Sequence, residues 1–176
     1  MFSHAPKTHR RSRIRSVVAS VAVLVGAAGI VAPAAANAAP VTKTFVVDAV
    51  TAGANGVFAD SGVTVANGAP VTVTATGTAT YDPGITPVGP NGRDGAICGA
   101  EQSPCAIAGQ NYVALIGKVG TADPVLVGEG PTTLSGSGPL QFAINDNLDG
   151  YYNNSGSFTV TITYTPACTG LFCFGS

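Results

Sequence analysis

The densest group of possible ligand atoms in this 176-residue chain lies in one short segment of carboxylate and amide side chains. Within ten residues the segment contains Asn145, Asp146, Asn147, Asp149, Asn153 and Asn154. Hard cations such as calcium bind about six to eight oxygen atoms from carboxylates, amides and backbone carbonyl groups. Asp, Asn and Gly also form the tight turns between strands. The composition therefore predicts either a calcium site or an elaborate turn, and it leaves both open.

The first half of this segment has the spacing of an EF-hand calcium loop. Asn145, Asn147, Asp149 and Gly150 match its opening positions. The match fails at the twelfth position, where Gly156 stands in place of the required Glu, and the flanking residues have strand patterns. An EF-hand is therefore excluded.

Histidine is absent from the part of the chain that carries this segment, which removes several classes of chemistry. His4 and His9 are the only histidines, and both lie before residue 38. Without them, neither a Ser-His-Asp or Cys-His catalytic site nor a histidine-ligated zinc or copper site can form in the remainder. A carboxylate pair of Asp146 and Asp149 is the remaining hydrolytic arrangement. Because the acids are scattered singly along turns, we expect a protein that is not an enzyme.

The first 38 residues have the three-part layout of a secretory signal peptide. Lys7 and four arginines lie before residue 16, an uncharged run follows at 17–32, and Ala36-Asn37-Ala38 matches a cleavage signal. The run is shorter than the roughly 18 apolar residues of a membrane span. We therefore predict a signal peptide at 1–38, a single domain at 39–176, and a secreted, extracellular protein with no membrane span after cleavage.

The predicted mature chain is acidic. Lys43, Arg93 and Lys118 are its only basic residues, and all nine acids remain, so the net charge is 3 − 9 = −6. A negative protein repels phosphate groups, which makes nucleic acid an unsuitable partner.

The four cysteines form two closely spaced pairs. Cys98 and Cys105 are seven residues apart, and Cys168 and Cys173 are five apart. Four cysteines allow three pairings, and the spacing favours the two local disulfides over a zinc site, which would need closer C-x-x-C pairs. We expect one disulfide to stiffen its loop and the other to tie down the C-terminal tail.

Alternation with a period of two predicts the elements that must hold these segments in place. Valine and small residues alternate with threonine, a pattern typical of half-buried antiparallel strands. We predict strands at 44–50, 71–81, 112–119, 124–127, 140–145 and 158–164, and loops at 82–109 and 145–156. In the second strand the expected inward residues are Val71, Val73, Ala75, Gly77, Ala79 and Tyr81. Gly and Pro interrupt every helical candidate, so the predicted fold class is all-β, a small antiparallel β-sandwich of about eight strands.

Three stretches of sequence, in this order, resemble a known family. They are Ala114-Leu115-Ile116-Gly117-Lys118-Val119-Gly120, then Ile144-Asn145-Asp146, then Tyr152-Asn153-Asn154-Ser155-Gly156-Ser157-Phe158-Thr159-Val160. From about Val46 to Tyr164 the chain resembles the PA-IL-like galactophilic lectin family, small β-sandwich proteins that bind galactosides through a calcium ion. The resemblance implies a jelly-roll, galactose-binding-domain-like sandwich.

The resemblance also implies a set of calcium ligands. Tyr81 and Gly150 would contribute backbone carbonyl oxygens, Asp146 its carboxylate, and Asn153 and Asn154 their amide oxygens. A sugar would bind on the open side of the ion through two vicinal hydroxyl groups, and Asp146 and Asn153 would also contact it.

The chain departs from the family pattern beside the expected sugar. Its stretch at 92–98 is shorter and lacks the His and Gln that grip galactose in the family. Arg93 and Asp94 stand there as replacement sugar contacts, and Asn147 stands where the family has an apolar one. Two neighbouring tyrosines, at 151 and 152, either stack on a sugar or divide between core and surface.

These observations together predict a calcium-dependent carbohydrate-binding protein that recognises a hexose such as galactose. The alternative is a non-catalytic structural or interaction module of the cell envelope, in which calcium only fixes the loop. The related lectins form tetramers, so a homo-oligomer is a further expectation.

Overall fold

The computed structural model describes residues 38–99 and 104–166 of the chain. The predicted signal peptide, apart from its last residue, and the pair Cys168 and Cys173 lie outside the described residues. The described part contains strands and two 3-10 turns, Ala54–Gly56 (η1) and Tyr151–Asn153 (η2). In it no helix has the length and apolar character needed to cross a membrane.

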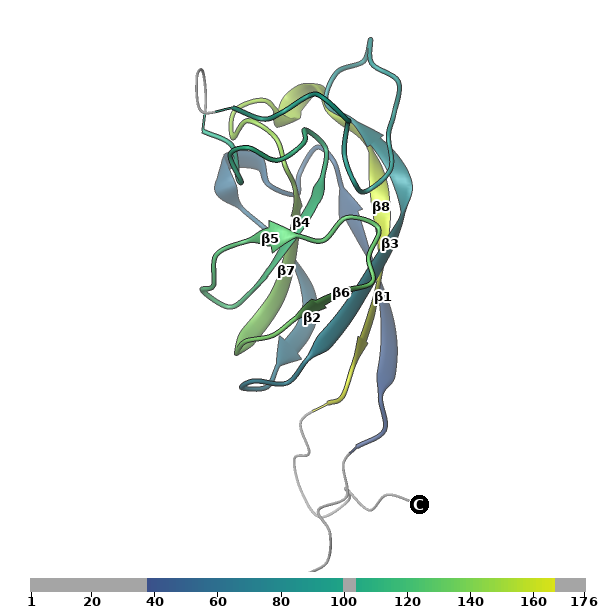
Figure 1. Ribbon diagram of the computed structural model, residues 1–176, viewed down its shortest axis with the longest axis vertical. Coiled ribbons are helices and arrows are strands. Elements are labelled where there is room, and N and C mark those ends of the chain that lie inside the picture. The colour runs from purple at the N-terminus through teal and green to yellow at the C-terminus, as the bar shows by residue number, and fades with distance from the viewer. Residues whose placement is uncertain (1–37, 100–103, 167–176) are drawn as a thin grey trace, which may run out of the picture. The chain divides into compact units, whose positions relative to one another are not determined.

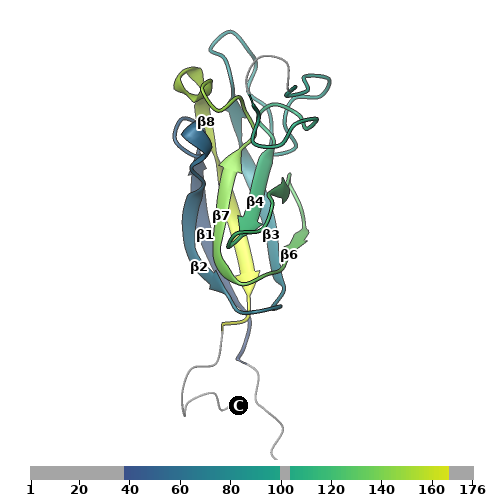
Figure 2. The same cartoon turned by 90° about the vertical axis from the view of Figure 1, so that its left-hand side faces the viewer.

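The strands form two antiparallel sheets, as predicted (Figures 1 and 2). The strand order is β1-β8-β3-β6 in one sheet and β2-β7-β4-β5 in the other. The bounds are Val41–Asp48 (β1), Ala59–Val65 (β2), Val71–Thr80 (β3), Leu115–Val119 (β4), Val125–Leu126 (β5), Thr132–Leu134 (β6), Gly138–Ile144 (β7) and Ser155–Tyr164 (β8). The predicted all-β sandwich is confirmed.

Alternate side chains of both sheets form the core between them. Strands β3 and β8 pair without a register shift from Val71 opposite Tyr164 to Thr80 opposite Ser155. Each large apolar side chain buried here contributes roughly 1.5–3 kcal/mol relative to an exposed one. The largest buried side chains are Phe142, Phe158, Leu115, Ile116, Leu140, Ile144, Ile162, Val47, Val63, Val71, Val73 and Val113.

The predicted inward face of the strand at 71–81 is interrupted near its end. Gly77 is exposed, and the strand ends at Thr80 rather than Tyr81. Thr80 is only 4% exposed, and its hydroxyl donates to the backbone carbonyl of Asp82 at 2.9 Å. That bond satisfies the buried hydroxyl, so a threonine takes an inward place that the alternation assigns to the outside.

Strands β2 and β6 are absent from the predicted set. In β2, the inward position at Ser61 is polar, and its hydroxyl donates to the carbonyl of Leu140 at 2.7 Å. The register of β2 against β7 also shifts between Asp60 and Thr64. Burial in β2 nevertheless alternates with a period of two. The sequence hides that alternation, because a polar serine occupies an inward position and a glycine an outward one. Strand β6 has three residues, too few to show a period.

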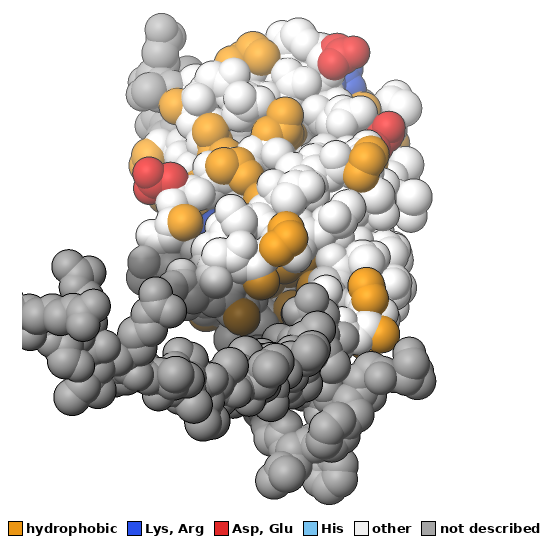
Figure 3. All heavy atoms as spheres, turned by 60° about the horizontal axis from the view of Figure 1, so that its bottom comes forward, with side chains coloured by type: hydrophobic (Ala, Val, Ile, Leu, Met, Phe, Trp, Pro, Cys, Tyr) orange, Lys and Arg blue, Asp and Glu red, His pale blue; other side chains and the backbone are white. Residues whose placement is uncertain are grey.

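The long loop that follows β3 and the segment that follows β7 gather at the same end of the sandwich, the upper end in Figure 1. The beginning of β1 and the end of β8 lie at the opposite end. On the face shown in Figure 3, charged side chains are few, in keeping with a sequence of which 10% is charged.

Candidate functional site

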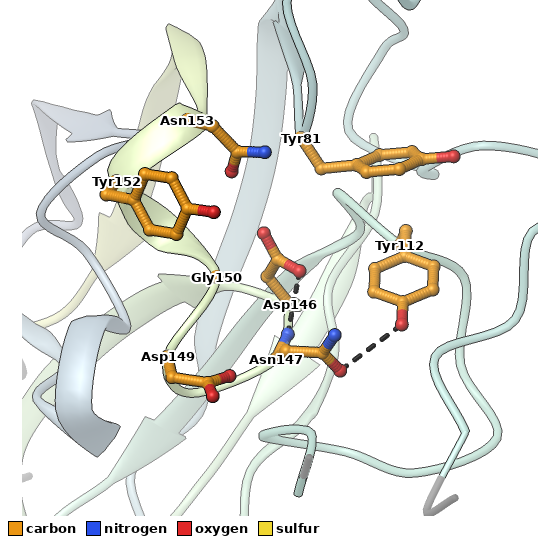
Figure 4. A pocket seen from close by; sticks show the side chains of 8 residues that line it. All are labelled: Tyr81, Tyr112, Asp146, Asn147, Asp149, Gly150, Tyr152 and Asn153. Atoms are coloured by element: carbon orange, nitrogen blue, oxygen red, sulfur yellow. Dashed lines mark hydrogen bonds between the residues drawn. The ribbon is translucent and has the colours of Figure 1, made fainter. Parts of the chain in front are cut away.

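A cavity of about 380 Å³ opens at the end of the sandwich where the two loop segments meet. Figure 4 shows its lining side chains, which come from the end of β3, the long loop, the segment after β7, and η2. They are Tyr81, Tyr112, Asp146, Asn147, Asp149, Gly150, Tyr152 and Asn153. Four of the five predicted calcium ligands are therefore brought to one cavity from segments that are distant in sequence.

Strand pairing explains this convergence. The last pair of β3 and β8 is Thr80 opposite Ser155, so Tyr81 and Asn154 follow at the same end of these two neighbouring strands. Asp146 comes two residues after the end of β7 in the other sheet. The cavity thus lies where strand ends of both sheets meet, and it needs the correct register of both.

The Asp146 carboxylate is buried, with 3% of the residue exposed. Its Oδ1 accepts a hydrogen bond from the backbone N–H of Asn147 at 2.7 Å, whereas its Oδ2 is buried without a hydrogen-bond partner. Burial raises the pKa of this carboxyl above its ordinary value of 3.8, and the charge of Asp149 acts in the same direction. Contacts with the Asn154 amide and the Asn147 N–H lower the pKa, but they offset only part of the rise.

Asn154 is the second buried polar side chain with an unpaired oxygen. It is 5% exposed, and its Nδ2 donates to the carbonyl of Ala49 at 3.1 Å. This bond determines the orientation of the amide, because a flipped amide would place its oxygen against that carbonyl. The Oδ1 is then left buried with no partner. Buried polar atoms are normally satisfied, so two such acceptors in adjacent side chains require an explanation.

The donor set indicates which ion would fit. Within residues 38–99 and 104–166, no three His, Cys, Asp or Glu side chains gather to hold a metal. The available atoms are carboxylate, amide and backbone carbonyl oxygens, which suit calcium rather than zinc or copper. In the described part of the chain, the buried side-chain oxygens that lack a hydrogen-bond partner are Asp146 Oδ2 and Asn154 Oδ1, and both belong to predicted calcium ligands. The residues present therefore fit a calcium ion.

The turn around Gly150 brings the remaining predicted groups to the cavity. The Gly150 N–H donates to the Asn147 carbonyl at 2.8 Å. A side chain at position 150 would reach Asp146 Oδ1 at 3.4 Å, which is ordinary contact. Tyr151 is 2% exposed and donates its hydroxyl to the Ile144 carbonyl, and burial raises its pKa. Tyr152 is 83% exposed and lines the cavity. The two tyrosines thus divide between core and surface.

Asn145 belongs to the oxygen-rich segment in sequence, but in the structure it holds the long loop. The residue is fully buried. Its Oδ1 accepts from the Ile107 N–H at 2.8 Å, and its Nδ2 donates to the carbonyls of Ile107 and Asn111 at 3.1 and 3.2 Å. Its amide is therefore used entirely within the protein and is not available to a ligand.

The structure does not bring every predicted sugar contact to the cavity. Neither Arg93 nor Asp94 is among the lining residues. The backbone N–H of Arg93 donates to the carbonyl of Tyr112 at 2.9 Å, so this stretch supports the cavity wall from behind. Asn147 does line the cavity.

Tyr112 lines this cavity, although it was not among the site residues predicted from the sequence. The pattern placed it in the strand predicted at 112–119, whereas β4 begins only at Leu115. The Tyr112 ring stacks on that of Tyr81, with centroids 5.0 Å apart and planes at 28°. Its hydroxyl donates to Asn147 Oδ1 at 3.2 Å. No sequence signal identifies this contact, because the three residues come from separate segments.

The predicted disulfide between Cys98 and Cys105 is present. Both sulfur atoms lie 3.6 Å from Asn147 Oδ1. The backbones of Cys105 and Asn147 also pair as an isolated antiparallel β-bridge. The disulfide thus closes part of the long loop beside a residue that lines the cavity.

Comparison with known proteins provides a structural relative. No protein-family model matches the sequence, and no match is found among curated protein sequences. Among solved structures, the chain is similar to the N-terminal domain of EclA, described as a PllA-like lectin, with 23% sequence identity and a TM-score of 0.51. The match covers 69% of this chain and 94% of that one. At this identity the likeness shows the fold, and this chain has the β-sandwich fold of that lectin domain.

Proposed function

We propose that this protein is a secreted, non-catalytic lectin that binds a carbohydrate through a calcium ion. The observation that carries the proposal is the pair of buried acceptors without partners, Asp146 Oδ2 and Asn154 Oδ1, beside a polar cavity. A bound cation would satisfy both oxygens, which otherwise carry an uncompensated desolvation cost. The fold shared with a lectin domain supports the same reading.

The calcium ligands in this proposal are the predicted ones. Asp146, Asn153 and Asn154 contribute side-chain oxygens, and Tyr81 and Gly150 contribute backbone carbonyl oxygens. When bound, the ion supplies positive charge that attracts the oxygen atoms of vicinal sugar hydroxyl groups. The carboxylates of Asp146 and Asp149 are the natural acceptors for the hydroxyl protons, because hydrogen bonds to charged acceptors are the strong ones.

The ligand proposed is a hexose such as galactose. The cavity is lined by polar and aromatic groups, among them the Asp149 carboxylate and the exposed ring of Tyr152. A neutral polyol suits this lining, and the acidic net charge of −6 for residues 39–176, from 3 − 9, disfavours phosphorylated ligands. The Cys98–Cys105 disulfide is compatible with export to an oxidising compartment.

One observation favours a second candidate, a structural or interaction module of the cell envelope. Asp146 and Asn154 are almost fully buried, at 3% and 5% exposure. An ion held there could serve only to fix the segment after β7 against the end of β3. In that case the ion would bind without any sugar.

The test is calorimetric titration of the purified protein with calcium, followed by galactose in the presence of calcium and again in the presence of a chelator. Calcium binding and calcium-dependent sugar binding are the expected results. Calcium binding without galactose binding leads to a glycan array, and an array without ligands supports the structural module. Absence of calcium binding refutes both candidates.

A further inference from the structure

The wall of the cavity formed by Tyr81, Tyr112 and Asn147 has no role in the proposed calcium ligation through its side chains. Both aromatic rings are half-buried, so part of each is accessible. Because they stack on each other, their edges and outer faces remain for a ligand. Aromatic surface of this kind contacts the apolar C–H face of a sugar ring favourably.

Asn147 is oriented by its neighbours rather than by a ligand. Its Oδ1 accepts the Tyr112 hydroxyl at 3.2 Å and lies against the Cys98–Cys105 disulfide. Among the described residues, its Nδ2 has no protein partner. Figure 4 shows the side-chain nitrogen in the space between Asp146 and Tyr112, with the oxygen turned toward the Tyr112 hydroxyl. The amide is thus set as a hydrogen-bond donor that faces the cavity.

The backbone that carries Tyr112 is held in an unusual conformation. Val113 has a φ of 69°, a left-handed conformation that is rare for a β-branched residue and costs roughly 1–3 kcal/mol. The Val113 N–H donates to the Asn145 carbonyl at 2.8 Å, and the Tyr112 N–H donates to Ala96 at 2.8 Å. This turn places the Val113 side chain in the core and the adjacent Tyr112 side chain in the cavity wall.

We propose that Tyr81, Tyr112 and Asn147 form a second subsite that binds the neighbouring sugar ring of an oligosaccharide. The inference rests on the proposed function. A cavity of about 380 Å³ falls in the range of roughly 300–1,000 Å³ that holds drug-sized ligands, which are larger than one hexose. Calcium and its ligands serve one ring, and the aromatic pair and the Asn147 donor serve the next. Tyr112 is the specificity-determining residue, because it provides a ring and orients Asn147.

The experiment measures calcium-dependent affinity for matched probes that differ by one ring: galactose with lactose, and mannose with an α-linked dimannoside. Wild type is compared with Tyr112→Ala and Tyr112→Phe. Tyr164→Phe is the matched control, because this half-buried tyrosine ends β8 at the far end of the sandwich. Calcium affinity and thermal unfolding of each variant are measured in parallel.

The expected result is that wild type binds the better disaccharide about tenfold more tightly than its monosaccharide. Tyr112→Ala abolishes this gain, with monosaccharide and calcium affinity unchanged. Tyr112→Phe retains the aromatic ring but loses the hydroxyl that donates to Asn147 Oδ1. The preference for the disaccharide should therefore fall from about tenfold to about threefold. Tyr164→Phe behaves as wild type.

Three results would overturn the inference, and they are distinguishable. Monosaccharide binding with no gain for either disaccharide refutes the second subsite alone and leaves the proposed function standing. A disaccharide gain that survives in both Tyr112 variants refutes the role of Tyr112. Absence of binding to all four probes and to every sugar of a glycan array refutes the proposed function and the inference together. If Tyr112→Ala fails to fold, Tyr112→Phe decides the matter.

Discussion

Replacement of Asp146 by Asn tests whether the buried carboxylate is kept for a cation. Without calcium, this carboxylate has one buried oxygen without a partner, and Asn154 Oδ1 beside it has none either. In Asp146→Asn the charge is gone, and the new amide N–H groups can donate to Asn154 Oδ1. The shape of the side chain is unchanged, and the bond from the Asn147 N–H to Oδ1 is retained. We therefore expect the variant to be more stable than wild type in a chelator.

The magnitude follows from the two unpaired acceptors. An unsatisfied buried polar group costs about 1–3 kcal/mol, and a charged one costs more. We expect a gain of about 2 kcal/mol, which corresponds to a rise in melting temperature of about 5–10 °C for a domain of this size. Calcium at about 100 times its dissociation constant should stabilise wild type by about 2.7 kcal/mol. It should not stabilise the variant, so the order of stability should reverse.

The pKa of Asp146 adds a pH dependence to this comparison in the chelator. Burial raises the folded-state pKa above 3.8, so the folded state binds this proton more tightly than the unfolded state does. The stabilising contribution is complete below about pH 3.8 and is lost as pH rises through the raised pKa. The advantage of Asp146→Asn should therefore be small near about pH 4 and grow toward neutral pH.

Thermal and urea unfolding, each in chelator and in millimolar calcium, provide the measurement. The reasoning would be refuted by a variant that is less stable than wild type in chelator at neutral pH, because the carboxylate would then have a partner within the protein. Equal stabilisation of both proteins by calcium would also refute it, since the ion would have to bind elsewhere.

Three further predictions concern the framework of the cavity. Asn145→Ala removes the buried amide that clamps the long loop, so urea unfolding should show a loss of about 3 kcal/mol. The double replacement of Cys98 and Cys105 by Ser should cost about 2.5 kcal/mol for a loop of this length, and reduction of wild type with dithiothreitol should cost at least as much, because it also opens the predicted Cys168–Cys173 disulfide; an unchanged midpoint contradicts this. Gly120→Ala should cost about 2 kcal/mol more than Gly56→Ala. Both glycines have positive φ, but a Cβ at position 120 would lie 2.3 Å from a backbone oxygen, whereas position 56 is open; equal melting temperatures would show that the backbone yields.

Local patterns in the sequence predicted most of the strands. Threonine alternates with apolar or small residues in β3 and in most of β8, and a period of two is a property of the strand itself. The prediction missed β2, although burial alternates along it, because residue type does not report that a serine points inward. Ser61 is buried there because its hydroxyl donates to the Leu140 carbonyl, a contact that only the pairing of β2 with β7 provides.

The candidate site was likewise predicted only in part from the sequence. The residue types of the segment from Asn145 to Asn154 predict an oxygen-rich cluster, and the absence of histidine after His9 excludes several chemistries. Composition cannot distinguish Asn145 from Asn154, which are the same amino acid in one segment. Contacts distinguish them: the amide of Asn145 is used entirely by the long loop, and the oxygen of Asn154 has no partner.

The sequence by itself therefore determined an all-β chain of alternating strands, a local disulfide and a segment rich in oxygen ligands, because each depends on residues that are close along the chain. Only the tertiary structure decided that Tyr112 stacks on Tyr81 and orients Asn147. These residues lie on three separate segments, and they meet because the register of two sheets and the path of a disulfide-bonded loop bring their ends together.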